Sequence, residues 1–210
     1  MGTAREEDAS AGRGEGGESR QTARRTQILQ GATAVFARLG YHGARMDDIV
    51  KESGLSKGTI YWYFTSKEEI AVELVHQLLR AEEESMELPR EEGVTPEARL
   101  GAMAEDFTRS LREDPVRAPL ALELLALGQR IPAIKTYFAG YHEKYLALLA
   151  ELLGAASGRA PTEKRVRSAA VAVTAMVDGW ALHEALNPEH TATGESLGEA
   201  VAVLIDGLRS

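Results

Sequence analysis

The segment 56–63 reads SKGTIYWY and concentrates side chains that bind phosphate groups and base edges. It holds one serine, one threonine, one lysine and three consecutive aromatic residues, and its glycine lets the backbone approach a ligand closely. In a helix, Ile60 and Phe64 share one face at an i, i+4 spacing and fill the buried side. The remaining surface then predicts a nucleic-acid contact formed by Ser56, Lys57, Gly58, Thr59, Tyr61, Trp62 and Tyr63.

Two short helices joined by a tight turn are expected to position this surface. Ile49, Val50 and Ser53 give the first helix a narrow inward face. Gly54 ends that helix, because glycine tolerates a left-handed backbone, and Ser56 is a natural N-cap for the second. In a helix-turn-helix unit the second helix lies in the major groove of double-stranded DNA.

Charge is divided unevenly along the chain. The net charge is −8, yet residues 20–67 carry eight basic and three acidic residues. That segment is therefore +5 and the remainder is −13. Attraction to phosphate is screened beyond about 10 Å at ordinary ionic strength, so the local charge matters more than the total. The division supports DNA binding by an otherwise acidic protein.

The segment 24–78 resembles the DNA-binding domain of TetR-type transcriptional regulators. The resemblance is carried by Gly40-Tyr41, Asp48-Ile49, the run Gly54-Leu55-Ser56-Lys57-Gly58-Thr59-Ile60-Tyr61, Phe64 and Ser66-Lys67-Glu68. Ala44 departs from the family pattern, which usually has threonine or serine there. A capping or phosphate-binding hydroxyl is therefore not expected at this position.

The resemblance also implies roles for individual residues. Tyr61 and Tyr63 would offer hydroxyls to phosphates, and Lys67 would supply a positive charge. Arg45, beside the departing Ala44, is expected to reach the DNA backbone. The bases would be approached by the first residues of the second helix, Lys57, Gly58 and Thr59.

Hydrophobic periodicity predicts an all-α protein of about nine helices in three parts. Residues 1–19 lack periodicity and are rich in glycine and charge, so a disordered tail is expected there. Residues 20–66 would form the helix-turn-helix domain. Residues 67–210 would form a helical regulatory and dimerisation domain.

Caps and breakers suggest where several helices begin and end. The first helix is expected over 20–39, before Gly40, with Leu39 on its buried stripe. Ser66 and Glu69 form a capping box for a helix that extends to about residue 86. Loops are expected at 88–95 and 154–160. Later helices would begin at Thr95-Pro96, Asp114-Pro115 and Ile131-Pro132.

The helix expected over 162–186 has apolar residues on two nearly opposite faces. Val166, Val173 and Val177 lie on one face, while Val171 and Leu182 lie on the other. A helix that is apolar on both sides is covered on both sides. The last helix, expected over 196–208, also has an apolar stripe. The pair predicts a homodimer interface, since TetR-like proteins form a four-helix bundle from their final two helices.

The second part of the chain also predicts an effector cavity. The candidate lining residues are Met103, Phe107, Glu123, Tyr137, Tyr141, Asp178 and Trp180. A pocket made from them suits an apolar small molecule, and it suits a cation if Glu123 and Asp178 face it. The alternative is that internal arginines pair with both carboxylates and leave the pocket neutral. The stretch 176–180 (MVDGW) resembles a regulatory-domain subgroup that includes betaine- and choline-related repressors.

Other chemistry is not supported. The pattern G-x-S-x-G at 54–58 follows a helix, whereas a hydrolase nucleophile requires a preceding strand. The five histidines lack H-E-x-x-H spacing, so no metal, cofactor or catalytic residue is expected. No apolar run is long enough to span a membrane. The absence of cysteine fits a cytoplasmic protein.

The combined interpretation is a homodimeric, ligand-responsive repressor that a small molecule releases from a palindromic DNA operator. The alternative is a helical ligand-binding or scaffolding protein without operator recognition. Binding to a specific DNA sequence distinguishes the two.

Overall fold

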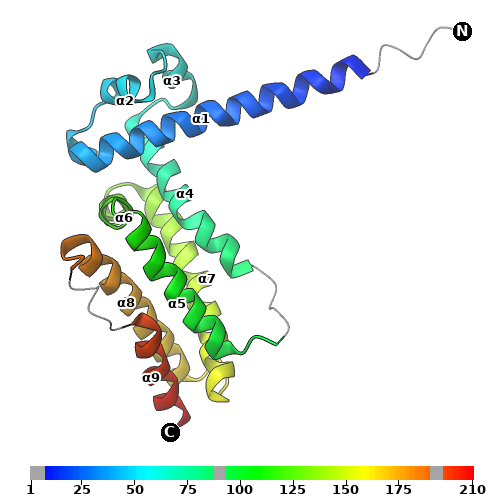
Figure 1. The fold of residues 1–210 in the computed structure, drawn as a ribbon, viewed down its shortest axis with the longest axis vertical. Helices are drawn as coiled ribbons and strands as arrows, with labels where there is room; N and C mark the ends of the chain where they lie inside the picture. Colours follow the sequence, from blue (N-terminus) through cyan, green and yellow to red (C-terminus); the bar gives the residue numbers. More distant parts are fainter. Residues whose placement is uncertain (1–7, 88–92, 190–195) are drawn as a thin grey trace, which may run out of the picture. The chain divides into compact units, whose positions relative to one another are not determined.

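The computed structural model describes residues 8–87, 93–189 and 196–210. Within these ranges the chain forms nine α-helices and one 3₁₀ turn, and no strand (Figure 1). The all-α prediction is confirmed. The chain divides into two compact units, Met1–Leu74 and Val75–Ser210. This division lies within α4 (Lys67–Glu87), whereas the predicted domain boundary lies at the start of that helix.

The first unit is formed by α1 (Asp8–Gly43), α2 (Met46–Ser53), α3 (Lys57–Tyr63) and the first turns of α4. Its core is apolar and buried, and includes Ile28, Val35, Phe36, Ile49, Ile60, Phe64 and Ile70. Gly31 lets α1 and α2 approach closely, because a Cβ there would lie 3.1 Å from the N, Cα and Cβ atoms of Ser53. The close crossing of α1 and α2 fixes the position of α2, the helix that precedes the turn before α3.

Two predictions about α1 are wrong. Its backbone is helical from Asp8, where a disordered tail was expected through residue 19; residues 1–7 of that tail lie outside the described residues. The expectation rested on composition, because stretches rich in glycine and charge favour disorder. Leu39 is 44% exposed, because Gly40 adopts φ 68° and breaks the helix. Tyr41 takes the inward position instead and packs against Phe36, with ring centroids 5.5 Å apart.

The second unit contains the rest of α4 and the remaining helices. These are α5 (Pro96–Glu113), α6 (Arg117–Ala126), the 3₁₀ turn Leu127–Gln129, α7 (Pro132–Ser157), α8 (Lys164–Leu186) and α9 (Leu197–Arg209). Figure 1 shows α5, α7, α8 and α9 lying alongside one another, and their apolar side chains form one core. In the described ranges, no helix combines the length and apolarity needed to cross a membrane.

Helices in this unit largely begin where the sequence predicts. The Thr95 hydroxyl accepts from Ala98 N at 3.2 Å, and the Ser196 hydroxyl accepts from Glu199 N at 3.0 Å. α6 begins later than predicted, at Arg117. The predicted loop at 154–160 is partly wrong, because α7 continues to Ser157. Glycine is required at position 154 by close packing, because a Cβ there would lie 2.9 Å from Arg159 O. Of the other predicted loop, residues 88–92 lie outside the described residues.

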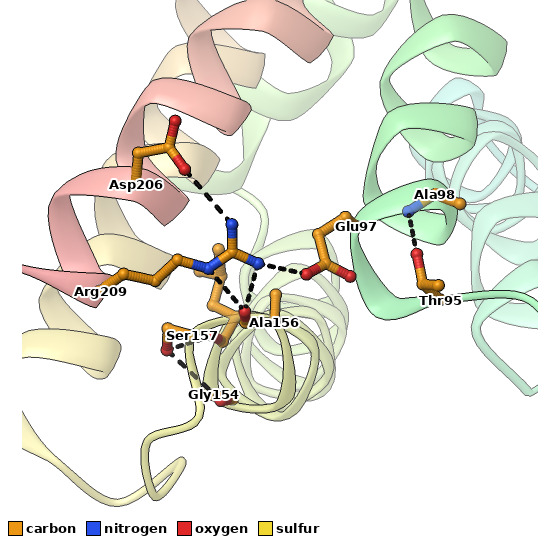
Figure 2. Close-up of polar contacts among 9 residues, drawn as sticks. Thr95, Glu97, Ala98, Gly154, Ala156, Ser157, Asp206 and Arg209 are labelled. Atoms are coloured by element: carbon orange, nitrogen blue, oxygen red, sulfur yellow. Dashed lines mark hydrogen bonds and ion pairs between the residues drawn. The ribbon is translucent and has the colours of Figure 1, made fainter.

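Arg209 fastens the end of α9 to the neighbouring helices (Figure 2). Its guanidinium donates to Ala156 O at the end of α7, at 2.8 Å, and to the Glu97 carboxylate at the start of α5, at 2.5 Å. It also contacts Asp206 at 3.3 Å. Arg165 of α8 donates to Gly207 O at 3.1 Å, so α9 ends level with the beginning of α8. These contacts fix the end of α9 against α5, α7 and α8.

Candidate functional site

The surface of α3 separates into a buried and an exposed side, as predicted. Ile60 is fully buried and Phe64 is nearly so. Trp62 is 69% exposed and Tyr61 is 41% exposed. The other predicted contact residues of this helix are exposed or half-buried, namely Ser56, Lys57, Gly58, Thr59 and Tyr63. A continuous face of hydroxyl, cationic and aromatic groups is therefore available to a ligand.

The start of α3 is held by its own hydroxyl groups. Ser56 Oγ accepts from Thr59 N at 3.1 Å, which is the predicted N-cap. The Ser56 and Thr59 hydroxyls also share a hydrogen bond of 2.8 Å. Gly58 lies beside them, and a Cβ there would meet nothing closer than Ser56 Oγ at 4.0 Å. The backbone at this end of the helix is thus open to close approach.

Lys57 has a local partner that the sequence did not reveal. Its Nζ lies 2.8 Å from Asp47 Oδ1 in α2 and 5.8 Å from the ring centroid of Tyr61. Both side chains of the ion pair are largely exposed, and such pairs contribute at most about 1 kcal/mol. Lys57 can therefore exchange Asp47 for a phosphate or base at small cost. In the free protein the pair orients Lys57 along the face of α3.

The junctions before α2 and α3 also depend on side-chain bonds. Asp48, the third residue of α2, accepts from Arg45 N through Oδ2 at 2.9 Å, so its carboxylate satisfies the N–H of the N-cap residue. This leaves the exposed Arg45 side chain directed to solvent or a ligand. Gln27 of α1 donates to Ser53 O at the end of α2, at 2.8 Å. Sequence reasoning missed Gln27, since a contact between residues so far apart in the chain has no local signal.

Lys67 lies in an unexpected setting. Its ammonium donates to Tyr41 O at 2.5 Å and to Ala44 O at 2.8 Å, and lies 4.3 Å from the centroid of the Tyr41 ring. The side chain thereby ties the start of α4 to the turn between α1 and α2. The predicted phosphate contact stays a prediction, but the bonds in the free protein give Lys67 a positioning role.

Replacing Lys67 by alanine is expected to weaken DNA binding by releasing this turn, without changing how binding depends on salt. A lost phosphate contact would lower the slope of log affinity against log salt by about 0.9, whereas a lost internal tie leaves it unchanged. Fluorescence anisotropy with a labelled duplex across a salt series measures both quantities. Lys51→Ala, at an exposed position of α2, is the control for loss of a surface charge. A reduced slope for Lys67→Ala would assign its main role to phosphate.

In the second unit the predicted ligand-binding residues fall into two neighbouring groups. Met103 and Phe107 line a cavity of about 20 Å³ between α5, α7, α8 and α9, together with Tyr145. A space of that size holds about one water molecule, so this cavity is smaller than the drug-sized pocket that the sequence predicts. Tyr145 stacks on Tyr141 with centroids 6.0 Å apart, which joins this cavity to a polar cluster.

The polar cluster contains two acidic residues of α4 that sequence reasoning missed. Tyr141 OH donates to Glu82 at 2.5 Å, and Arg117 pairs with the same carboxylate at 3.3 Å. Tyr137 OH donates to Glu83 at 2.7 Å. Burial and the negative charges of Glu82 and Asp178 raise the pKa of Tyr145 to about 12. The cluster is thus a pair of stacked phenols beside two carboxylates.

Asp178 and Trp180 are two further predicted residues of this unit, the first exposed and the second half-buried. Loss of hydration raises the pKa of the Asp178 carboxyl, although nearby His142 opposes this shift and part of the side chain is exposed. Among the described residues no cation pairs with Asp178. The buried Trp180 Nε1 likewise has no hydrogen-bond acceptor within the described chain. Glu123 lies half-buried on α6. No group of three acidic or histidine side chains is placed to hold a metal in the part described.

Comparison with known proteins identifies both units. Residues 28–74 match the family described as "Bacterial regulatory proteins, tetR family". Residues 96–209, more than half of the chain, match "BetI-type transcriptional repressor, C-terminal". The chain belongs to the TetR family. It is a DNA-binding transcriptional regulator, which confirms the predicted function class, and it is not an enzyme.

Individual relatives extend over most of this TetR-family chain. The regulator LmrA of Bacillus subtilis is 26% identical over 161 residues, which span 75% of this chain and 84% of LmrA. UidR of Escherichia coli is 24% identical over 186 residues, or 88% and 92% of the two chains. The solved structure of Bacillus subtilis FadR in complex with stearoyl-CoA has a TM-score of 0.64 and 25% identity, and covers 88% of this chain and 97% of its own.

Proposed function

We propose that the protein is a homodimeric repressor that a small molecule releases from a near-palindromic operator. The observation that carries the DNA-binding part is the division of α3, with Ile60 and Phe64 buried and the SKGTIYWY face exposed. This face lies in the segment 20–67, which carries a net charge of +5 in an otherwise acidic chain. The proposed DNA-contacting residues are Arg45, Ser56, Lys57, Gly58, Thr59, Tyr61, Trp62 and Tyr63. Lys67, which the sequence also predicts for this site, is proposed to position the turn beside them. Such a protein acts in the cytoplasm, where the bacterial chromosome lies.

The proposed dimer forms through α8 and α9. The second apolar face of α8 is left uncovered by its own chain, with Val171 at 55%, Leu182 at 44% and Leu186 at 76% exposure. An exposed apolar row of this kind is usual at protein interfaces. Two copies related by a two-fold axis would each present one α3 to one half of the operator.

The proposed effector is an apolar molecule that carries a positive charge. Tyr141, Tyr145 and Asp178 support this, because aromatic faces and an unpaired carboxylate both attract cations. The neutral-pocket alternative requires an internal arginine for Asp178, and none pairs with it among the described residues. An effector that enters the 20 Å³ cavity would have to enlarge it, and the resulting movement would change the fit to the operator.

Selection of duplexes from a random pool by the purified full-length protein tests the DNA-binding proposal. We expect enrichment of a near-palindrome with half-sites about one helical turn apart. Affinity for it should fall steeply with salt, by about a thousandfold or more between 50 and 200 mM if six or more phosphates are contacted. A pool without any enriched motif, or binding that salt does not weaken, would contradict the proposal.

A further inference from the structure

The ion pair between Asp47 and Lys57 lies on the exposed surface where α2 and α3 meet. Lys57 is the first residue of α3, and its Nζ lies 2.8 Å from Oδ1 of Asp47 in the first turn of α2. The same Nζ is 5.8 Å from the ring centroid of Tyr61, one helical turn further along α3. The side chains of Lys57 and Asp47 are 61% and 72% exposed. Asp47 therefore belongs to the proposed DNA-contacting face, although sequence reasoning did not include it.

The two adjacent carboxylates at the start of α2 have different partners. Asp48 accepts from Arg45 N, so it helps to begin the helix. Asp47 accepts from Lys57, and this hydrogen bond raises the pKa of the lysine, so both groups are charged at neutral pH. Their bond uses one of three ammonium donors and one of two carboxylate oxygens. The pair can therefore present a donor and an acceptor side by side to a ligand.

A carboxylate beside Lys57 makes the DNA backbone an unfavourable partner for this pair. A phosphate in contact with Lys57 would lie within a few ångströms of Asp47, and two negative charges at that separation repel each other. The edges of the bases differ, because every base pair presents an amino donor next to a carbonyl acceptor in the major groove. The carboxylate can accept from the amino group while the ammonium donates to the carbonyl oxygen. The pair therefore suits a base pair better than it suits a phosphate.

We propose that Asp47 and Lys57 together recognise one G·C base pair in each half-site, with Lys57 donating to guanine O6 and N7 and Asp47 accepting from cytosine N4. This pairing depends on the proposed contact of α3 with DNA and adds Asp47 as a specificity-determining residue. Guanine O6 and cytosine N4 share a Watson–Crick hydrogen bond, so they lie about 3 Å apart, close to the 2.8 Å between Nζ and Oδ1. An A·T pair fits less well, because thymine offers the ammonium one acceptor where guanine offers two adjacent ones.

Selection of duplexes from a random pool, repeated with full-length Asp47→Ala and Lys57→Ala, tests the shared base pair. Both variants should weaken the preference for G·C at the same position of each half-site and keep the preference at the other positions. Glu52→Ala is the matched control, because Glu52 is an exposed carboxylate of α2 that pairs with Arg38 of α1 at 2.9 Å. It should select the same motif as the unmodified protein. All three positions are exposed, so circular dichroism should report an unchanged helix content for each variant.

Fluorescence anisotropy with altered operators tests which groups of the base pair are recognised. Changing this G·C pair to A·T should lower the affinity of the unmodified protein by about ten- to a hundredfold for each half-site, and by clearly less for Asp47→Ala. Changing it to inosine·cytosine should leave the affinity unchanged, because only the guanine amino group in the minor groove is lost.

Two results would overturn the shared base pair while the contact of α3 with DNA stands. In the first, the two variants lose preference at different positions. In the second, Asp47→Ala binds every duplex more tightly by the same factor, which would mean that the carboxylate only repels DNA. If the unmodified protein selects no motif at all, the proposed contact of α3 with DNA is itself contradicted.

Discussion

Replacing Gly31 by valine is expected to abolish operator binding while the regulatory unit remains folded. A Cβ at this position would lie 3.1 Å from three atoms of Ser53, two of which belong to the backbone. Valine adds two further methyl groups, so α1 and α2 must separate. Overpacking of this kind costs about 1–3 kcal/mol, and more where backbone atoms must move.

The effect on DNA binding should exceed the effect on stability. Ser53 O accepts from Gln27, and Ser53 Oγ accepts from Leu55 N in the turn before α3. Displacing Ser53 therefore also displaces this turn. A shifted α3 loses its hydrogen-bonding geometry with the bases, and in a dimer the loss occurs at both half-sites. We expect specific affinity to fall at least about a hundredfold, since each lost base contact costs about 1–3 kcal/mol.

Anisotropy with the selected operator and thermal unfolding measure the two effects of Gly31→Val separately. Gly140→Val is the matched control, because Gly140 is an exposed helical glycine with nothing within 4 Å of an added Cβ. This control should bind the operator as the unmodified protein does. Normal affinity in Gly31→Val would mean that the α1–α2 crossing does not position the recognition helix.

How far the sequence predicts this protein depends on the range of the interactions involved. The exposed and buried sides of α3 follow from the spacing of Ile60 and Phe64, because helical periodicity is a local property. The two apolar faces of α8 follow from residue spacing in the same way, and Val171, on the second face, is 55% exposed in its own chain. Lys67 is different, because its partners are the backbone oxygens of Tyr41 and Ala44, which carry no sequence signal.

The effector site shows the same limit. Tyr141 and Asp178 stand out as polar groups within apolar helices, and the structure places both in one electrostatic cluster. Glu82 and Glu83 do not stand out, because they belong to the acidic run AEEESMEL near the end of α4. Only the packing of α4 beside α7 brings Glu82 to the Tyr141 hydroxyl. Cavity size is equally inaccessible to sequence, since it depends on how tightly the helices close.

An effector that is a lipophilic cation should lose most of its ability to release the operator when Asp178 is replaced by asparagine. The concentration required should rise about ten- to a hundredfold, because a bond to a charged group contributes about 1.5–3 kcal/mol. Matched probes are benzyltrimethylammonium, benzenesulfonate and benzyl alcohol in an operator-release assay. Glu105→Gln, an exposed carboxylate on α5, is the control and should leave the response unchanged.

The same substitution should stabilise the protein in the absence of effector, which separates a binding role from a structural one. The pKa of Asp178 is raised in the folded state, so the folded protein binds the proton more tightly than the unfolded chain. Stability then falls as pH rises through the window between the ordinary pKa of 3.8 and the raised value, and the cost persists at neutral pH. An asparagine side chain carries no charge and avoids that cost.

Higher thermal stability at pH 7 combined with a weaker response to the cation is therefore the expected pair of results for Asp178→Asn. A residue that only supports the fold would give the opposite pair, because its loss would lower the unfolding temperature and affect all three probes alike. Equal release by cation, anion and neutral probe, or an unchanged response in the variant, would rule out a cationic effector at this site.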